Sequence, residues 1–331
     1  MKKKAVALFS GGLDSIVAIK VVLEQGIDVV ALTFKTQFCR CGGKGCAGHA
    51  ASKMSDQLGV KTKYVYLAEE YLDIIIKPKH GHGKNINPCL DCRIMMHKKA
   101  KEYMDEIGAS FIFTGEVLGQ RPMSQHKRAL SLIDRKSNLE GVILRPLSAR
   151  LLAPTIAEKE GWINRDVLLN ISGRSRKEQM ALADKYDIHD YPCPAGGCLL
   201  TDPAFSKRIK DLIHHNELTV NNIELLKRSR YFRISPSFKL FVGRNEQENE
   251  KLQKLAKKGD LLLQPKTLPG PTAIGVGEFD SSQIDLAAKI VARYTDKDNP
   301  VDIEVNIISN HSRSSLVADA ISEAGIEKIL I

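Results

Sequence analysis

The chain has 331 residues, 43% of them hydrophobic, which is enough apolar sequence for two folded domains. No apolar run approaches the roughly 18 residues that a membrane helix needs, and the apolar stretch AVALF after the N-terminal lysines is too short for a signal peptide. We therefore expect a cytoplasmic protein with no membrane partner. The net charge of +10 suits a polyanionic partner such as a nucleic acid, although a merely soluble basic protein would also carry it.

The first half of the chain alternates short apolar runs with amphipathic stretches. The pattern predicts strands over residues 4–9, 28–34, 62–67 and 109–116, and helices over residues 15–26, 47–58 and 91–108. Such alternation indicates a parallel sheet with helices on both faces, in which sites lie at the carboxyl ends of the strands. Ser10, Cys39 and Gly115 each follow a predicted strand, so we expect them along one rim.

The pattern changes beyond residue 174. A helix is predicted there, followed by the irregular stretch YPCPAGGCLLTDP and further helix to about residue 228. The last hundred residues open with YFRISPSFKLFVGRN, which is typical of two strands in a hairpin, and continue through a polar helix over 246–258. The tail over 302–331 predicts a strand, a helix and a strand.

All seven cysteines lie in clusters: Cys39, Cys41 and Cys46, then Cys89 and Cys92, then Cys193 and Cys198. Structural disulfides are rare in a reducing compartment. Cysteines that merely fill a core would be scattered singly, so the clustering favours metal ligation or sulfur chemistry.

The segment SGGLDS, residues 10–15, joins the first predicted strand to the first helix. Two glycines allow a tight turn whose N–H groups point into a concavity, and the helix N-terminus adds partial positive charge. Ser10 and Ser15 add hydroxyl donors. The lysine of a Walker A loop is missing, as is the GxGxxG pattern, but the segment still predicts a phosphate site.

SGGLDS after a buried strand resembles the signature of the PP-loop ATP pyrophosphatases. The resemblance implies an α/β fold with a parallel sheet of the adenine nucleotide alpha hydrolase-like kind, and a reaction that adenylates a substrate and releases pyrophosphate. It implies ATP as cosubstrate, with Asp14 placing Mg²⁺ or the attacked phosphate. The residues expected to contact the nucleotide are Ser10, Gly11, Gly12, Asp14, Ser15, Gly115 and Gln120.

Three further segments resemble the tRNA-thiolating branch of this group. TGEVLGQRPMSQ is similar to a segment of tRNA 4-thiouridine synthetase, NPCLDC to the cysteine position of tRNA 2-thiouridylases and cluster-dependent thiolases, and Cys193 stands at the place of their distant essential cysteine. Residues from YFRISPSF onward resemble the RNA-binding module of NFACT proteins. The implied domains are a PP-loop domain over 1–180, a cysteine-containing connector over 181–228, and a smaller α+β RNA-binding domain over 229–331.

The resemblance implies a tRNA sulfurtransferase that adenylates a uridine carbonyl and replaces its oxygen by sulfur, with 4-thiouridine slightly favoured over 2-thiouridine as product. The implied partners are tRNA and a sulfur donor, either a cysteine desulfurase or inorganic sulfide, and a homodimer is one option for assembly. Because SGGLDS begins at residue 10, we expect RNA capture to fall to the C-terminal module. The rival hypotheses are an amide-forming PP-loop ligase for a small molecule and a non-catalytic RNA-binding protein.

Cys89, Cys92 and Cys193 are the candidate catalytic thiols, together with Asp14 of the glycine turn. Three cysteines can hold a [4Fe–4S] cluster with one iron open to sulfide, which is the favoured hypothesis. The alternatives are a persulfide relay between two thiols, a zinc site, or structural thiols. A helix N-terminus at Cys89 and Cys92 would lower their thiol pKa values. Cys198 is a spare that could carry a persulfide or act as a fourth ligand.

Other candidate residues are less decisive. Cys39, Cys41, Cys46 and His49 could hold Zn²⁺ or be loop thiols, and His80 and His82 are more typical of a polar loop than of a phosphate contact. Basic residues suited to ATP or RNA phosphates are Arg121, Lys127, Arg128, Arg174, Arg176 and Lys177, the last three equally compatible with a solvated helix face. In the C-terminal module, an RNA surface is expected at Tyr231, Phe232, Arg233, Lys239 and Arg244, with Phe232 and Phe241 expected in the core.

Overall fold

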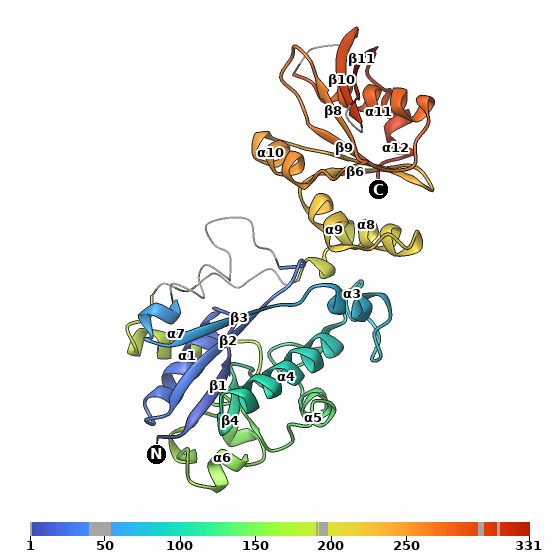
Figure 1. Cartoon of the computed structure of the whole chain (residues 1–331). Coiled ribbons are helices and arrows are strands. Elements are labelled where there is room, and N and C mark those ends of the chain that lie inside the picture. The colour runs from blue at the N-terminus through green and yellow to red at the C-terminus, as the bar shows by residue number, and fades with distance from the viewer. Residues whose placement is uncertain (1, 40–53, 190, 192–197, 297–300, 310–311) are drawn as a thin grey trace. The chain divides into compact units, whose positions relative to one another are not determined.

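The computed structural model describes residues 2–39, 54–189, 191, 198–296, 301–309 and 312–331. The chain divides into two compact units, Met1–Asp202 and Pro203–Ile331 (Figure 1). Within the described residues, no helix has both the length and the apolar character needed to cross a membrane.

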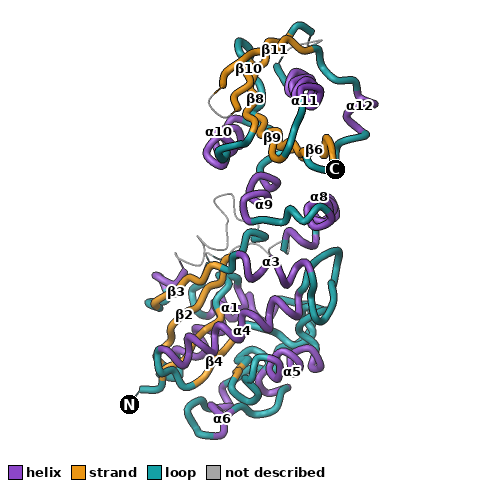
Figure 2. Tube along the Cα trace, turned by 45° about the vertical axis from the view of Figure 1, so that its right-hand side comes forward, coloured by secondary structure: helices purple, strands orange, loops and turns teal. Residues whose placement is uncertain are grey.

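The first unit is built on a parallel sheet with the strand order β3-β2-β1-β4-β5 (Figure 2). Its strands are β1 (Lys4–Leu8), β2 (Asp28–Lys35), β3 (Lys61–Tyr66), β4 (Phe111–Thr114) and β5 (Ile143–Leu144). Each neighbouring pair is parallel. The predicted parallel α/β fold is therefore confirmed, and β3 forms one edge of the sheet.

Helices cover both faces of this sheet because alternate strand residues bury side chains on opposite sides. Residues Ala5, Ala7, Val29 and Ala31 pack with α1 in one core, whereas Val6, Leu32 and Ile112 pack with Ala100 of α4 in the other. The helices are α1 (Leu13–Leu23), α3 (Glu69–Ile76), α4 (Cys89–Glu106), α5 (Lys127–Lys136), α6 (Ile156–Lys159) and α7 (Lys177–Lys185). Most of the helix predicted over 47–58 lies outside the described residues.

The second unit contains a six-stranded antiparallel sheet with the order β11-β10-β8-β9-β7-β6. The strands are β6 (Arg230–Ser235), β7 (Phe238–Val242), β8 (Leu261–Pro265), β9 (Ala273–Gly277), β10 (Ile303–Ser309) and β11 (Ser312–Ala318). The helices are α8 (Pro203–His214), α9 (Val220–Lys227), α10 (Glu246–Leu255), α11 (Ser281–Arg293) and α12 (Glu323–Glu327). Apolar residues of α11 pack on the sheet and form the core, so the expected α+β class is confirmed.

The tail differs from the strand–helix–strand prediction. β10 is followed by β11, which pairs antiparallel with it from Ser309 opposite Ser312 to Ile303 opposite Ala318, and only then by the short helix α12. The serine-rich stretch SRSSLVA is a weak helix former, and its ladder with β10 outweighs local propensity. The last predicted strand is reduced to a bridge between Leu330 and Phe232.

Candidate nucleotide and thiol site

The glycine turn folds tightly between β1 and α1. Gly11 has a φ of 73°, a backbone conformation that favours glycine. The Ser15 hydroxyl donates to the Gly12 carbonyl oxygen at 2.8 Å and lies 3.2 Å from the Ser10 hydroxyl. These contacts hold the turn so that the N-terminus of α1 stands at the carboxyl edge of the sheet, where an anion is favoured.

Gly115 brings the end of β4 against this turn. A Cβ atom at Gly115 would lie 2.5 Å from the backbone nitrogen of Ser15 and 2.6 Å from the carbonyl carbon of Asp14. Further along the same segment, Gln120 Nε2 donates to Asp14 Oδ2 at 3.3 Å. The structure therefore brings together the residues expected to contact a nucleotide, which are Ser10, Gly11, Gly12, Asp14, Ser15, Gly115 and Gln120.

Helix α7 and the residue before it add two side chains near Asp14, Gln179 and Arg176. Burial raises the pKa of the Asp14 carboxyl, while Arg176, Gln120 and Gln179 oppose that rise. The Gln179 side chain is fully buried, and neither of its amide atoms has a hydrogen-bond partner within the described ranges. Asp14 Oδ1 and Arg176 Nε are likewise buried without a partner there. Buried polar atoms are normally hydrogen-bonded, so this convergence fits a polar ligand such as a phosphate chain.

The thiols of Cys89 and Cys92 lie in the first turn of α4, and both side chains are half-buried. Cys198 approaches from a distant segment, where the Leu199 N–H donates to the Phe38 carbonyl oxygen at 3.1 Å. The Cys198 Sγ atom lies 3.8 Å from the same oxygen. Cys39, the residue after Phe38, therefore lies beside Cys198 on neighbouring backbone.

Tyr71 of α3 stands among these thiols. Burial raises the pKa of its hydroxyl, and three thiols lie near enough to raise it further: Cys92, Cys198 and Cys39. The Tyr71 ring also lies 5.9 Å from the ring of Phe38. The structure thus gathers Cys39 and Cys198 around the same tyrosine as Cys92, a grouping that clustering along the sequence does not reveal.

The expectation that the helix N-terminus lowers the thiol pKa values is wrong for Cys92. Burial raises the pKa of this thiol to about 11, although Tyr71 and Arg93 oppose the rise. Burial also raises the pKa of Cys198 to about 12. Loss of water around the Cys92 thiol outweighs the opposing effects of Tyr71 and Arg93.

The metal ligands expected from the sequence are only partly covered by the structure. Cys193, Cys41, Cys46 and His49 lie outside the described residues. Among the residues that are described, no group of three or more His, Cys, Asp or Glu side chains is arranged to hold a metal ion. Cys39, Cys89 and Cys92 are the expected ligands that the structure places.

A network of ion pairs lies next to the thiol pair of α4. Arg93, next to Cys92, pairs with Glu116, and Arg145 Nε donates to Glu116 Oε2 at 3.0 Å. Arg145 also pairs with Asp134 at 2.7 Å. Burial alone would raise the pKa of Glu116, but the two guanidiniums lower it to about 2. Sequence reasoning missed this network, although a glutamate two residues after a buried strand is a signal that could have found it.

The charge of Arg121 interacts with both the glycine turn and the thiols of α4. Although Arg121 as a whole is exposed, partial loss of water around its guanidinium and the Arg93 charge lower the pKa of that group, whereas Cys89 and Asp14 act in the opposite direction. Arg121 is therefore within electrostatic range of both a thiol and the glycine turn. Lys127 and Arg128 are exposed, as are Arg174 and Lys177.

The two histidines before NPCLDC are engaged with protein groups. His80 Nδ1 lies 2.8 Å from Asp91 Oδ1, and His82 Nε2 lies 2.8 Å from the carbonyl oxygen of Ile75. These contacts agree with a polar loop rather than with a phosphate site.

The RNA surface expected around YFRISPSFK is wrong for Tyr231, Arg233 and Lys239. Tyr231 and Phe232 are fully buried, and Lys239 is only 2% exposed. Burial of Phe232 and Phe241 confirms their predicted place in the core. Arg244 is exposed but pairs with Glu248 at 2.6 Å.

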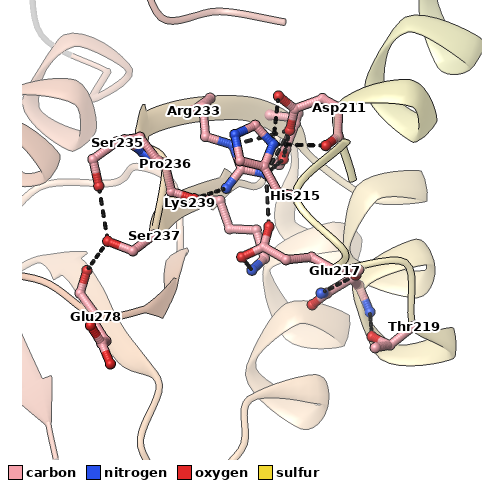
Figure 3. Close-up of polar contacts among 12 residues, drawn as sticks. Asp211, His215, Glu217, Thr219, Arg233, Ser235, Pro236, Ser237, Lys239 and Glu278 are labelled. Atoms are coloured by element: carbon pink, nitrogen blue, oxygen red, sulfur yellow. Dashed lines mark hydrogen bonds and ion pairs between the residues drawn. The ribbon is translucent and has the colours of Figure 1, made fainter. Parts of the chain in front are cut away.

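The polar members of this set form a closed network with carboxylates of α8 and the α8–α9 connection (Figure 3). Arg233 Nη2 lies 2.6 Å from Asp211 Oδ2 and 2.8 Å from Glu217 Oε2. Lys239 Nζ lies 2.8 Å from Glu217 Oε1, and the Tyr231 hydroxyl donates to Asp211. Their charges are balanced inside the unit, so they are not available to phosphates.

In comparisons with known proteins, two separate segments of the chain match family models. Residues 1–150 match the family described as Thiamine biosynthesis protein (ThiI), and residues 229–329 match the family described as NFACT protein RNA binding domain. The first match lies in the unit that carries the glycine turn and the thiols of α4, and the second lies in the antiparallel unit.

Among curated proteins, the tRNA-specific 2-thiouridylase MnmA 1 of Caldanaerobacter subterraneus is 29% identical over 143 residues, which is 39% of each chain. The enzyme MnmA of Pseudomonas fluorescens is 24% identical over 222 residues, covering 64% of this chain and 56% of its own. The chain thus spans between 33% and 56% of the length of these and similar curated relatives.

Two solved structures show a looser resemblance. The U34-tRNA thiolase NcsA from Methanococcus maripaludis, with its [4Fe–4S] cluster, is 19% identical with a TM-score of 0.33 and covers 68% of this chain and 73% of its own. A 4-thiouridine synthetase in complex with RNA and ATP is 20% identical with a TM-score of 0.37 and covers 67% and 53%. These scores are too low to indicate a shared overall arrangement.

Proposed function

We propose that this chain, which joins a PP-loop domain of the tRNA-thiolation group to an NFACT-type RNA-binding domain, is an ATP-dependent tRNA sulfurtransferase. The enzyme adenylates a uridine carbonyl and replaces its oxygen by sulfur. The proposed product is 4-thiouridine in preference to 2-thiouridine. We place the PP-loop domain at residues 1–180, the connector at 181–228 and the RNA-binding domain at 229–331.

The observation that carries this proposal is the neighbourhood of the glycine turn and the thiol pair. Arg121 is in electrostatic range of both Asp14 and Cys89. Around the turn, Asp14 Oδ1, Arg176 Nε and the Gln179 amide are buried without protein partners in the part of the chain that is described. A phosphate chain would accept hydrogen bonds from Arg176 Nε and Gln179 Nε2, and Mg²⁺ held by Asp14 would satisfy the free carboxylate oxygen Oδ1.

The proposed reaction needs both the glycine turn and the thiols of α4 in one site. The uridine oxygen attacks the α-phosphorus of ATP, the bond to pyrophosphate breaks, and pyrophosphate leaves. The former carbonyl oxygen is then part of an AMP leaving group. A sulfur nucleophile attacks the uridine ring carbon that carries this oxygen, and AMP leaves together with the oxygen. Ser10, Ser15 and the N-terminus of α1 hold the phosphates, while the thiols on α4 handle the sulfur.

Cys89, Cys92 and Cys193 are proposed to hold a [4Fe–4S] cluster, which would supply an iron site for the incoming sulfide. In the alternative, Cys198 carries a persulfide and a second thiol releases the sulfur as a disulfide forms. The thiols of Cys89 and Cys92 fit either scheme because they lie three residues apart on one helical turn. We separately propose a Zn²⁺ site at Cys39, Cys41, Cys46 and His49. A cysteine desulfurase or inorganic sulfide as sulfur donor, and assembly as a homodimer, are further proposals.

The test is mass spectrometry of nucleosides from the bulk tRNA of a strain that lacks the gene. Loss of 4-thiouridine, restored by the wild-type gene but not by Cys193→Ala, is the expected result. Loss of 2-thiouridine instead would retain the reaction and change the atom. Persistence of every thiolated nucleoside, with no second gene of this kind in the strain, would contradict the proposal and favour adenylation of a small molecule.

A further inference from the structure

Two tyrosines of the edge strand β3 and a lysine of the neighbouring strand β2 share one face of the sheet. In this parallel pair, Tyr64 lies opposite Thr33 and Tyr66 lies opposite Lys35. Since strand residues alternate between faces, Thr62, Tyr64 and Tyr66 point to the same side. Tyr66 is 69% exposed, the highest value for a large hydrophobic side chain in the described part of the chain.

The Lys35 ammonium is held over these rings. Its Nζ atom lies 4.4 Å from the ring centroid of Tyr64 and 5.5 Å from that of Tyr66. The same unit offers an internal comparison, because Lys185 Nζ lies 5.7 Å from the ring centroid of Tyr186. There the tyrosine hydroxyl donates to Glu24 at 3.0 Å. The Tyr64 hydroxyl, in contrast, is buried and has no hydrogen-bond partner among the described residues.

A cavity of about 440 Å³ adjoins the same face of β3. It is lined by Ser55, Asp56, Gly59, Val60, Lys61, Thr62 and Tyr64. Thr62 Oγ1 is a second buried oxygen that lacks a partner over the described ranges. The cavity therefore combines two free hydroxyls with a lysine and a carboxylate at its wall.

We propose that this β3 platform, which consists of Lys35, Thr62, Tyr64, Tyr66 and the adjoining cavity, binds unstacked nucleotides of the RNA substrate. The inference rests on the proposed function and places an RNA contact on the catalytic unit itself, beyond the C-terminal module. Bases stack on tyrosine rings, and a cation beside the ring meets the adjacent phosphate.

Charge favours RNA over a second copy of the chain on this edge. Lys61 and Lys63 are exposed along β3, and lysines on an edge strand disfavour pairing with another strand. The same lysines attract a phosphate backbone. The platform therefore offers aromatic and cationic groups on one face of the sheet, while Lys61 and Lys63 add positive charge on the opposite face of the same edge strand.

The experiment measures binding of fluorescently labelled tRNA to the full-length protein by anisotropy. Tyr66→Ala and Lys35→Gln are expected to weaken binding by about fivefold or more, because each removes a stacking or phosphate contact. Tyr66→Phe keeps the ring and should bind as the wild type does. Lys185→Gln removes the matched cation over Tyr186 and should also bind normally.

Wild-type affinity in both Tyr66→Ala and Lys35→Gln, while the wild type binds tRNA, would overturn this inference and leave the proposed function standing. A wild type that binds no tRNA would instead refute the proposed function. Size-exclusion chromatography tests whether a second copy of the chain occupies the platform instead. If Tyr66→Ala converts a dimer to a monomer without changing tRNA affinity, the platform is an interface between two copies and the inference is wrong.

Discussion

Replacing Glu116 by glutamine would leave the buried Arg145 and the half-buried Arg93 without the carboxylate that they share. Arg145 would keep Asp134 as a partner. The two guanidiniums lower the pKa of Glu116 from its ordinary 4.5 to about 2, which corresponds to roughly 3 kcal/mol in favour of the charged form. Removing one member of a buried pair costs about 3–5 kcal/mol, so Glu116→Gln should destabilise the first unit by about 3 kcal/mol at pH 7.

Trp162 makes this measurement specific. It is the single tryptophan of the chain and packs against the main core of the first unit, so its fluorescence reports unfolding of that unit in urea. The matched control is Glu70→Gln, which breaks the surface pair between Glu70 and Lys99 and should change stability by less than about 1 kcal/mol. A loss below about 1 kcal/mol for Glu116→Gln would show that the network does not hold the site.

The same pair of proteins gives a pH test. Because the folded-state pKa of Glu116 lies below its unfolded value, its stabilising contribution is complete above about pH 4.5 and is lost as the pH falls toward 2. The stability difference between wild type and Glu116→Gln should therefore shrink below about pH 4.5. A difference that stays constant from pH 7 to about pH 3 would contradict the assignment of the charge to Glu116.

Three further predictions concern the nucleotide turn and the second unit. Gly115→Ala should weaken ATP binding and lower stability by about 1–3 kcal/mol, because the new Cβ atom would collide with the first turn of α1. Calorimetry measures the ATP binding, and unchanged binding would refute the close approach. Arg176→Gln should raise the KM for ATP about tenfold or more, whereas Arg174→Gln, an exposed change in the same segment, should leave it unaltered; equal effects would mean that only net charge matters. Lys239→Met should lower the thermal stability of the second unit by roughly 1–3 kcal/mol, followed by circular dichroism, because Glu217 loses a buried partner; an unchanged melting temperature would count against the network.

Local patterns were sufficient to predict the frame of the nucleotide site. The strand before SGGLDS, the two glycines and the strand before Gly115 all carry their own signals, and parallel pairing brings their ends to one edge. Gln179 could not be found in this way, because its role depends on α7 packing beside Asp14 from 165 residues further along the chain. Helical periodicity marks it only as a buried position.

The errors have a common physical origin in long-range pairing. Arg233 and Lys239 resemble RNA ligands in the sequence. The carboxylates that neutralise them, Asp211 and Glu217, come from α8 and from the α8–α9 connection. β11 takes its strand conformation from its ladder with β10 rather than from its own serines. Cys198 joins the thiols of α4 through a backbone contact with Phe38 that no spacing rule predicts.

The network around Arg233 also bears on where the antiparallel unit can be cut or transferred to another protein. The segment that matches the RNA-binding family begins at residue 229, whereas Asp211 and Glu217 precede it. A fragment starting at 229 would carry Arg233 and Lys239 into its interior with no counterions, and also the Tyr231 hydroxyl without its acceptor. A gene fusion or an expression fragment that retains this unit intact therefore has to begin at or before Pro203, the first residue of α8.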